Sequence, residues 1–95
     1  MKWLENIELR TGENNRESIV QYLKKLLEEI KDKEKKQSIK VYSHAMIDTD
    51  FSVSIFHDSQ KIENSGSSLG LYLTSILKEY GLVNHSVWIV LEKES

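Results

Sequence analysis

The sequence predicts an α+β fold in which four strands and two helices follow one another in the order βαββαβ. Two segments carry apolar side chains at the spacing of an amphipathic helix. Four others alternate between polar and apolar residues, or are continuously apolar, as strands do. The chain has 95 residues, an ordinary length for one domain, so we expect a single domain over residues 1–95.

The first strand and the first helix occupy the N-terminal third of the chain. Trp3 to Arg10 alternate loosely, which predicts the strand. Asn14 stands three residues before Glu17, the spacing of a capping box, and predicts the start of a helix over residues 15–32. The apolar side of that helix consists of Ile19, Leu23, Leu26, Leu27 and Ile30.

A hairpin is expected from residues 39–47 and 51–57, which both alternate with period two. The apolar residues of the two segments must share one face, and a shift of one residue would turn every side chain to the other face. A three-residue loop at Asp48–Asp50, or a bulge, satisfies this condition. It predicts two cross-strand pairs on the second face, Tyr42–Phe56 and His44–Ser54.

The second helix is expected after Ser67 or Ser68, either of which can cap it. Gly81 followed by Leu82 favours a Schellman-type end to this helix, and Val83 to Leu91 predict the last strand. Gly70 suggests close backbone packing. The apolar residues at helical spacing are Leu69, Tyr72, Leu73, Ile76, Leu77 and Tyr80.

Two right-handed strand–helix–strand crossovers in this order predict a ferredoxin-like sandwich. It consists of a four-stranded antiparallel sheet with both helices on one face, which leaves the other face open. The helix-facing residues are expected to be Ile7, Leu9, Ile39, Val41, Phe51, Val53, Ile55, Val87, Ile89 and Leu91.

The open face is the most informative feature of the sequence, because it carries large apolar side chains. Its expected members are Leu4, Asn6, Glu8, Arg10, Tyr42, His44, Met46, Ser52, Ser54, Phe56, Ser86, Trp88 and Val90. Leaving several large side chains exposed together makes a patch that monomers rarely tolerate. We therefore expect a ligand-binding or homodimer face made by Leu4, Tyr42, Met46, Phe56, Trp88 and Val90. A solvated face and a dimer that encloses a ligand cavity are the alternatives.

Three polar residues on that face are the candidate catalytic residues. Glu8 and Arg10 lie on the first strand, in the middle of the sheet, and would need partners if a dimer desolvated them. Arg10 suits a carboxylate or an oxyanion, and His44 suits proton transfer near neutral pH. The alternative is that Glu8 and Arg10 form interchain salt bridges and that His44 only hydrogen-bonds a neighbour.

The whole chain resembles the dimeric α/β-barrel group in its topology, although no family-specific motif is present. In that group two such sheets face each other, and its members include cofactor-free monooxygenases, small isomerases and proteins without known activity. The resemblance implies a homodimer that acts as an interaction or structural module, or one with a small-molecule or catalytic cavity between the sheets. A further alternative resembles the ACT type of regulatory domain, with its ligand at the Thr11–Gly12 turn. Whether the chain is an enzyme stays open.

Composition and spacing exclude several classes of function. There is no cysteine, so disulfide scaffolds and thiol catalysis are excluded. The three histidines share no metal-ligand spacing, so we expect no metal and no other cofactor. Gly66–Gly70 lacks the lysine of a phosphate loop, and Asp50–Phe56 lacks the RNA-recognition pattern, so no nucleic acid is expected. No signal peptide or membrane span is recognised, which predicts a soluble, cytoplasmic domain.

Overall fold

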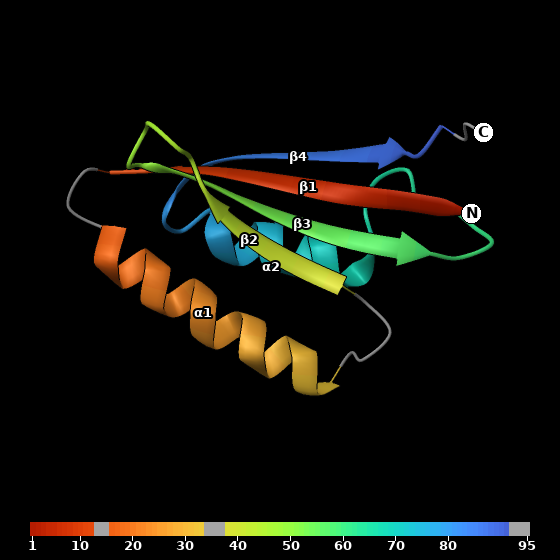
Figure 1. Cartoon of the computed structure of the whole chain (residues 1–95), viewed down its shortest axis with the longest axis horizontal. Helices are drawn as coiled ribbons and strands as arrows, with labels where there is room; N and C mark the ends of the chain where they lie inside the picture. Colours follow the sequence, from red (N-terminus) through yellow and green to blue (C-terminus); the bar gives the residue numbers. More distant parts are fainter. Residues whose placement is uncertain (13–15, 34–37, 92–95) are drawn as a thin grey trace.

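The computed structural model describes residues 1–12, 16–33 and 38–91. Its elements are β1 (Lys2–Thr11), α1 (Arg16–Lys33), β2 (Ser38–Ser43), β3 (Asp50–Asp58), α2 (Ser68–Leu77) and β4 (Gly81–Ile89). The strands form one antiparallel sheet in the order β2-β3-β1-β4. Both helices lie on the same side of this sheet (Figure 1). The predicted order of elements and the α+β ferredoxin-like topology are confirmed.

Strand β1 is the centre of the molecule because it pairs along its length with two neighbours. Its pairing with β3 runs from Lys2 opposite Asp58 to Arg10 opposite Asp50. Its pairing with β4 runs from Trp3 opposite Ile89 to Thr11 opposite Gly81. Side chains alternate across a strand, so every second residue of β1 faces the helices. These buried residues are Trp3, Glu5, Ile7, Leu9 and Thr11.

The hydrophobic core lies between the sheet and the two helices. Ile19, Leu23 and Ile30 enter it from α1, and Leu73 and Leu77 enter it from α2. The sheet contributes Ile7, Leu9, Ile39, Phe51, Val53 and Ile55, as their alternation predicted.

The expected core positions of Ile89 and Leu91 are wrong. Ile89 is 53% exposed and Leu91 is 87% exposed. Strand β4 is the edge strand of the sheet, and its end runs past α2 in Figure 1. Neither of the described helices buries these two side chains.

The hairpin keeps the predicted faces but changes the predicted register. Strand β2 ends at Ser43, and residues 44–49 form a longer connection than expected. Ile39 pairs with Ile55 and Val41 with Val53, so the apolar residues do share a face. The predicted pairs Tyr42–Phe56 and His44–Ser54 are wrong. The observed pairs on the open face are Ser38–Phe56, Lys40–Ser54 and Tyr42–Ser52.

Helix α2 begins as predicted and ends earlier. The hydroxyl of Ser67 caps it by accepting a hydrogen bond from the Gly70 N–H at 3.0 Å. The helix stops at Leu77, and Gly81 already belongs to β4 without a positive φ, so the expected Schellman end is wrong. A Cβ at Gly81 would collide with the Arg10 carbonyl oxygen, so close approach to β1 explains this glycine. The predicted cap at Asn14 lies outside the described residues.

The core predicts a difference between two truncations of similar size. Ile55→Ala removes a fully buried side chain and should lower the free energy of unfolding by about 2–5 kcal/mol. Leu71→Ala removes an α2 side chain that is 50% exposed, and it should cost less than about 1 kcal/mol. Urea unfolding followed by circular dichroism measures both. Equal losses would contradict this placement of the core.

Candidate functional site

The open face of the sheet carries an apolar row at the end of β1 nearest the N-terminus. Leu4 lies directly between Phe56 on β3 and Trp88 on β4. Val90 continues the row, since its N–H bonds to the Lys2 carbonyl oxygen at 3.0 Å. Phe56 is 37%, Trp88 59% and Val90 46% exposed, and Leu4 is half-buried. We call these four side chains the apolar row.

Two residues predicted for the same patch lie elsewhere. Tyr42 pairs with Ser52, which is also opposite Glu8, so it lies four residues along β1 from the apolar row. Met46 belongs to the connection after β2 and is 87% exposed. The structure therefore gathers four of the six predicted apolar residues.

Polar side chains occupy the middle of the open face. The Asn6 Oδ1 atom accepts hydrogen bonds from the Ser52 hydroxyl at 2.6 Å and the Ser54 hydroxyl at 3.3 Å. Ser54 is only 9% exposed, so its hydroxyl needs this partner. These bonds separate the apolar row from the opposite end of the face.

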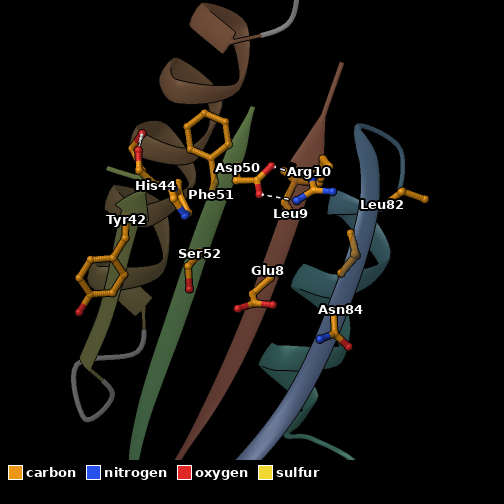
Figure 2. Close-up of a pocket in the computed structure, with 12 residues that line it drawn as sticks. Glu8, Leu9, Arg10, Tyr42, His44, Asp50, Phe51, Ser52, Leu82 and Asn84 are labelled. Carbon is orange, nitrogen blue, oxygen red and sulfur yellow. Dashed lines mark hydrogen bonds and ion pairs between the residues drawn. The ribbon is translucent and has the colours of Figure 1, made fainter. Parts of the chain in front are cut away.

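That opposite end contains a hollow of about 350 Å³ (Figure 2). All three candidate catalytic residues, Glu8, Arg10 and His44, line it. The sequence predicted that these residues share one face of the sheet, and in the structure they line the same hollow. The remaining lining residues are Leu9, Tyr42, Ser43, Asp50, Phe51, Ser52, Leu82, Val83 and Asn84.

Arg10 already has a partner within its own chain. Its Nε and Nη2 atoms each donate to one oxygen of the Asp50 carboxylate at 2.9 Å (Figure 2). Hydrogen bonding to this guanidinium lowers the pKa of Asp50, and the same bonds raise the pKa of Arg10. The pair neutralises itself, so Arg10 does not present a free fork to an anionic ligand.

His44 serves the connection between β2 and β3. Its Nδ1 atom accepts hydrogen bonds from the backbone N–H groups of Met46 and Ile47, both at 3.0 Å. The backbone N–H of His44 donates a hydrogen bond to the Asp50 carbonyl oxygen at 2.9 Å. The ring nitrogen nearest the backbone is therefore occupied by turn formation. This favours a structural role for His44 over proton transfer.

Arg16 holds the same connection from α1. Its Nη1 atom donates to the Asp48 carbonyl oxygen at 2.7 Å, and its guanidinium lies 5.4 Å from the centre of the Phe51 ring. The N–H of Thr11 bonds to the Thr49 carbonyl oxygen at 2.8 Å. The connection between β2 and β3, which forms one wall of the hollow, is thus held in place by contacts from α1 and β1. The Thr11–Gly12 position expected for an ACT-type ligand holds this wall, and residues 13–15 beyond it are not described.

Glu8 carries the uncompensated charge of the hollow. Its direct neighbours on β3 and β4 are Ser52 and Asn84, which are neutral. Figure 2 shows its carboxylate between these two strands. Among the charged lining residues, Arg10 and Asp50 cancel, so the hollow is negative when His44 is neutral. Its chemistry is that of a polar binding surface, with no nucleophile held against a base.

A second polar site, which sequence reasoning missed, lies on the opposite face of β1. Glu5 is fully buried there. The Nε2 atom of His57 lies 2.7 Å from its Oε2 atom, and the Nε2 atom of His85 lies 2.9 Å from its Oε1 atom. An ionised carboxylate only accepts hydrogen bonds, so both histidines donate to it. Trp3 stacks on the His57 ring with the centroids 4.0 Å apart.

The N-terminus of α2 completes the shell around this carboxylate. The Ser67 N–H donates to Glu5 Oε1 at 3.0 Å, and the Ser67 hydroxyl donates a short hydrogen bond to Oε2. A helix N-terminus favours an anion, and here the anion is a side chain of the same chain. Gly70 has to be glycine because a Cβ would collide with Glu5. The close packing expected at Gly70 is confirmed, and the Gly66–Gly70 segment offers no free anion site.

The hydrogen bonds decide the charge state of Glu5. Burial alone would raise its pKa, but the bonds from Ser67, His57 and His85 outweigh burial and lower it. Glu5 therefore carries a charge at neutral pH, and the surrounding donors stabilise it. We call Glu5, Ser67, His57 and His85 the Glu5 cluster.

The sequence did contain a signal for the Glu5 cluster. Glu5 stands between Trp3 and Ile7 in the alternation of β1, which places a carboxylate on the helix-facing side. His57 on β3 and His85 on β4 have the same, helix-facing parity. A buried acid on a core face requires donors, and these were the available ones. Within the described residues no group of three or more His, Cys, Asp or Glu side chains is arranged to hold a metal ion.

Comparisons with known proteins give no relative: no family model, no curated protein and no solved structure matches the chain. None of the helices in the described part of the chain is long and apolar enough to cross a membrane.

The Glu5 cluster predicts how stability depends on one carboxylate. Glu5→Gln replaces an acceptor by an amide N–H₂ that faces other donors, and it should lower the free energy of unfolding at pH 7 by about 1–3 kcal/mol. Glu8→Gln is the matched control on the same strand, because Glu8 is exposed on the other face. It should leave stability unchanged, and denaturant unfolding measures both. Equal effects would contradict the assignment.

The same carboxylate predicts a dependence on pH. The folded pKa of Glu5 is lower than its unfolded value. Its contribution to stability is therefore complete above the ordinary pKa of a glutamate and is lost as the pH falls through the folded pKa. The wild type should lose stability over this acid range more steeply than Glu5→Gln. Thermal unfolding at a series of pH values measures this, and parallel curves would refute it.

Proposed function

We propose that the chain is a self-associating module, a homodimer in which two open sheet faces pack against each other. The observation that supports this most is the apolar row, which is exposed on a face that no helix of the described chain covers. Burying aromatic and branched side chains together is the dominant source of association energy. The row lies on the inner strands β1 and β3 as well as on β4, so a partner would have to cover the face itself.

The size of the open face supports a partner as large as a second copy. Three of the strands have nine or ten residues and β2 has six, so with strands about 4.8 Å apart the face measures at most roughly 19 by 30 Å. Standard interfaces bury about 800 Å² on each partner, and the end of the face that carries the apolar row would supply part of that area. Apolar row against apolar row is a self-complementary contact, as a two-fold interface requires.

This arrangement would also explain the polar end of the face. Two sheets that pack through their apolar rows leave their hollows free at the other end, where Glu8 keeps its water. The resemblance in topology to the dimeric α/β-barrel group agrees with such an assembly, since two sheets face each other there. The proposal needs no catalytic step.

The test of the dimer is the mass of the protein in solution. Phe56→Glu places a charge in the apolar row on an inner strand, and it should shift the sedimentation coefficient at micromolar concentration towards that of a smaller species. Leu71→Glu, on the helix layer, is the control and should sediment as the wild type does. If Phe56→Glu and the wild type sediment alike, the proposal is wrong.

A second function is favoured by the hollow. Its volume of about 350 Å³ lies in the range of small-molecule sites, and Glu8 with the Tyr42 ring offers a carboxylate beside an aromatic surface. We propose that a small organic cation would occupy it, since Arg10 and Asp50 neutralise each other. The carboxylate of Glu8 would then pair with the ligand's positive charge.

Ligand-observed NMR with benzylamine and with benzoate tests this second function. Benzylamine should show saturation transfer from the wild type, less from Glu8→Gln, and benzoate should show none. Equal transfer from the wild type and from Glu8→Gln, or none from either, would exclude this use of the hollow.

A further inference from the structure

The outer edge of β4 is a second surface for association, separate from the open face. Strand β4 lies at one end of the sheet order, and no described strand or helix lies beyond it in Figure 1. An edge strand presents unpaired backbone N–H and C=O groups to which another strand can add. The described residues next to this edge are therefore a candidate site for strand pairing.

The hydrogen bonds of the sheet show which backbone N–H and C=O groups of β4 point away from β1. Because the Val90 N–H bonds to Lys2, Val90 points its backbone groups towards β1. In an antiparallel ladder this direction alternates along the strand, so Trp88 and Ser86 also bond to β1. The residues between them point their N–H and C=O groups away from the sheet. These are Val83, His85, Val87 and Ile89.

The sequence of this edge lacks the features that prevent pairing. Natural edges are protected by charges, prolines, bulges or short strands. Residues 81–91 contain no charged residue and no proline. The ladder with β1 is continuous from Gly81 to Ile89, without a bulge. The other edge strand, β2, has only six residues and carries Lys40.

We propose that β4 pairs with β4 of a second copy in antiparallel orientation, so that two sheets join into one. Ser86 is the midpoint of the uncharged segment 81–91. A two-fold axis at Ser86 therefore pairs the whole of this segment with the same segment of the second copy. This register places Leu82 opposite Val90 and Val83 opposite Ile89. Leu82 is 76% exposed, Ile89 53% and Val90 46%, so the pairing brings together apolar side chains that the single chain leaves in water.

A second copy fits this edge better than an unrelated strand. A strand that pairs with a second copy of itself must avoid placing like charges opposite each other. The residue pairs across this axis contain no charged residue, so they meet this condition. Both copies keep their helices on the same side of the joined sheet, and the open faces stay free. The two-fold axis of this contact is perpendicular to the sheet, whereas the axis of the face-to-face contact lies parallel to it. The two contacts use different surfaces, and they would close a tetramer only where the two axes intersect.

Disulfide trapping tests the pairing, since the chain has no cysteine of its own. At the two-fold axis, Ser86 lies opposite Ser86 of the second copy, and the two residues form a non-hydrogen-bonded pair. The Cα atoms of such a pair lie about 4.5 Å apart, which is within the range that a disulfide can bridge. Ser86→Cys should therefore form a covalent dimer on mild oxidation about tenfold or more faster than Lys40→Cys. Lys40→Cys is the matched control, in the same row of the sheet on the opposite edge.

The same experiment separates this pairing from the face-to-face dimer. A face-to-face contact depends on the apolar row, so Phe56→Glu removes any crosslink that such a contact makes at Ser86→Cys. The crosslink should persist in the Ser86→Cys, Phe56→Glu double variant, which disrupts only the apolar row. Equal crosslinking rates for Ser86→Cys and Lys40→Cys would overturn the proposal. A crosslinked product whose mass is not that of two copies of the chain would overturn it as well.

A backbone variant gives an independent readout. Val87→Pro removes an N–H that points to the free edge and leaves the ladder with β1 unchanged. Combined with Ser86→Cys it should slow crosslinking to the rate of Lys40→Cys, while circular dichroism confirms that the sheet is retained. A folded Val87→Pro variant that crosslinks at the undiminished rate would contradict pairing through this edge.

Discussion

The buried carboxylate of Glu5 is the interaction on which the arrangement of the sheet and the second helix depends. It lies on the central strand and accepts hydrogen bonds from His57 on β3, His85 on β4 and Ser67 at the start of α2. A charge in this position is stable only while each donor stays in place, because a buried acceptor without partners costs several times the net gain of one bond. One side chain therefore sets the position of α2 against three strands. The glycine at position 70 follows from the same contact.

This constraint separates the two faces of the sheet by function. The helix-facing side is filled by the core and the Glu5 cluster, and its ionisable groups are used internally. The open side carries the apolar row at one end and, at the other, the hollow with Glu8, which has no ion pair among the described residues. The proposed association through the open face and through the β4 edge would use surfaces that the internal packing leaves free.

The period-two alternation was sufficient to predict the order of elements, the faces of the sheet and most core residues. It also placed Glu8, Arg10 and His44 on one side, and they do line one hollow. The hairpin register could not be predicted, because parity fixes the face but allows any even shift between the strands. His44 illustrates this: its Nδ1 atom stabilises a turn after Ser43, which ends β2 before the alternation does. Arg10 was expected to bind a ligand or a second chain, but Asp50 lies directly opposite in the observed register. The Glu5 cluster required three strands to be aligned at once, which the separate segments do not specify.

The most direct measurement of the account is small-angle X-ray scattering with an absolute mass. A single chain has a mass of 11.1 kDa and a radius of gyration, over its Cα atoms, of 13.8 Å. If the open face and the β4 edge are association surfaces, the scattering mass at micromolar to millimolar concentration should be at least twice 11.1 kDa. The radius of gyration should then be clearly larger than 13.8 Å. A mass of 11.1 kDa with a radius near 13.8 Å across that range would contradict the account.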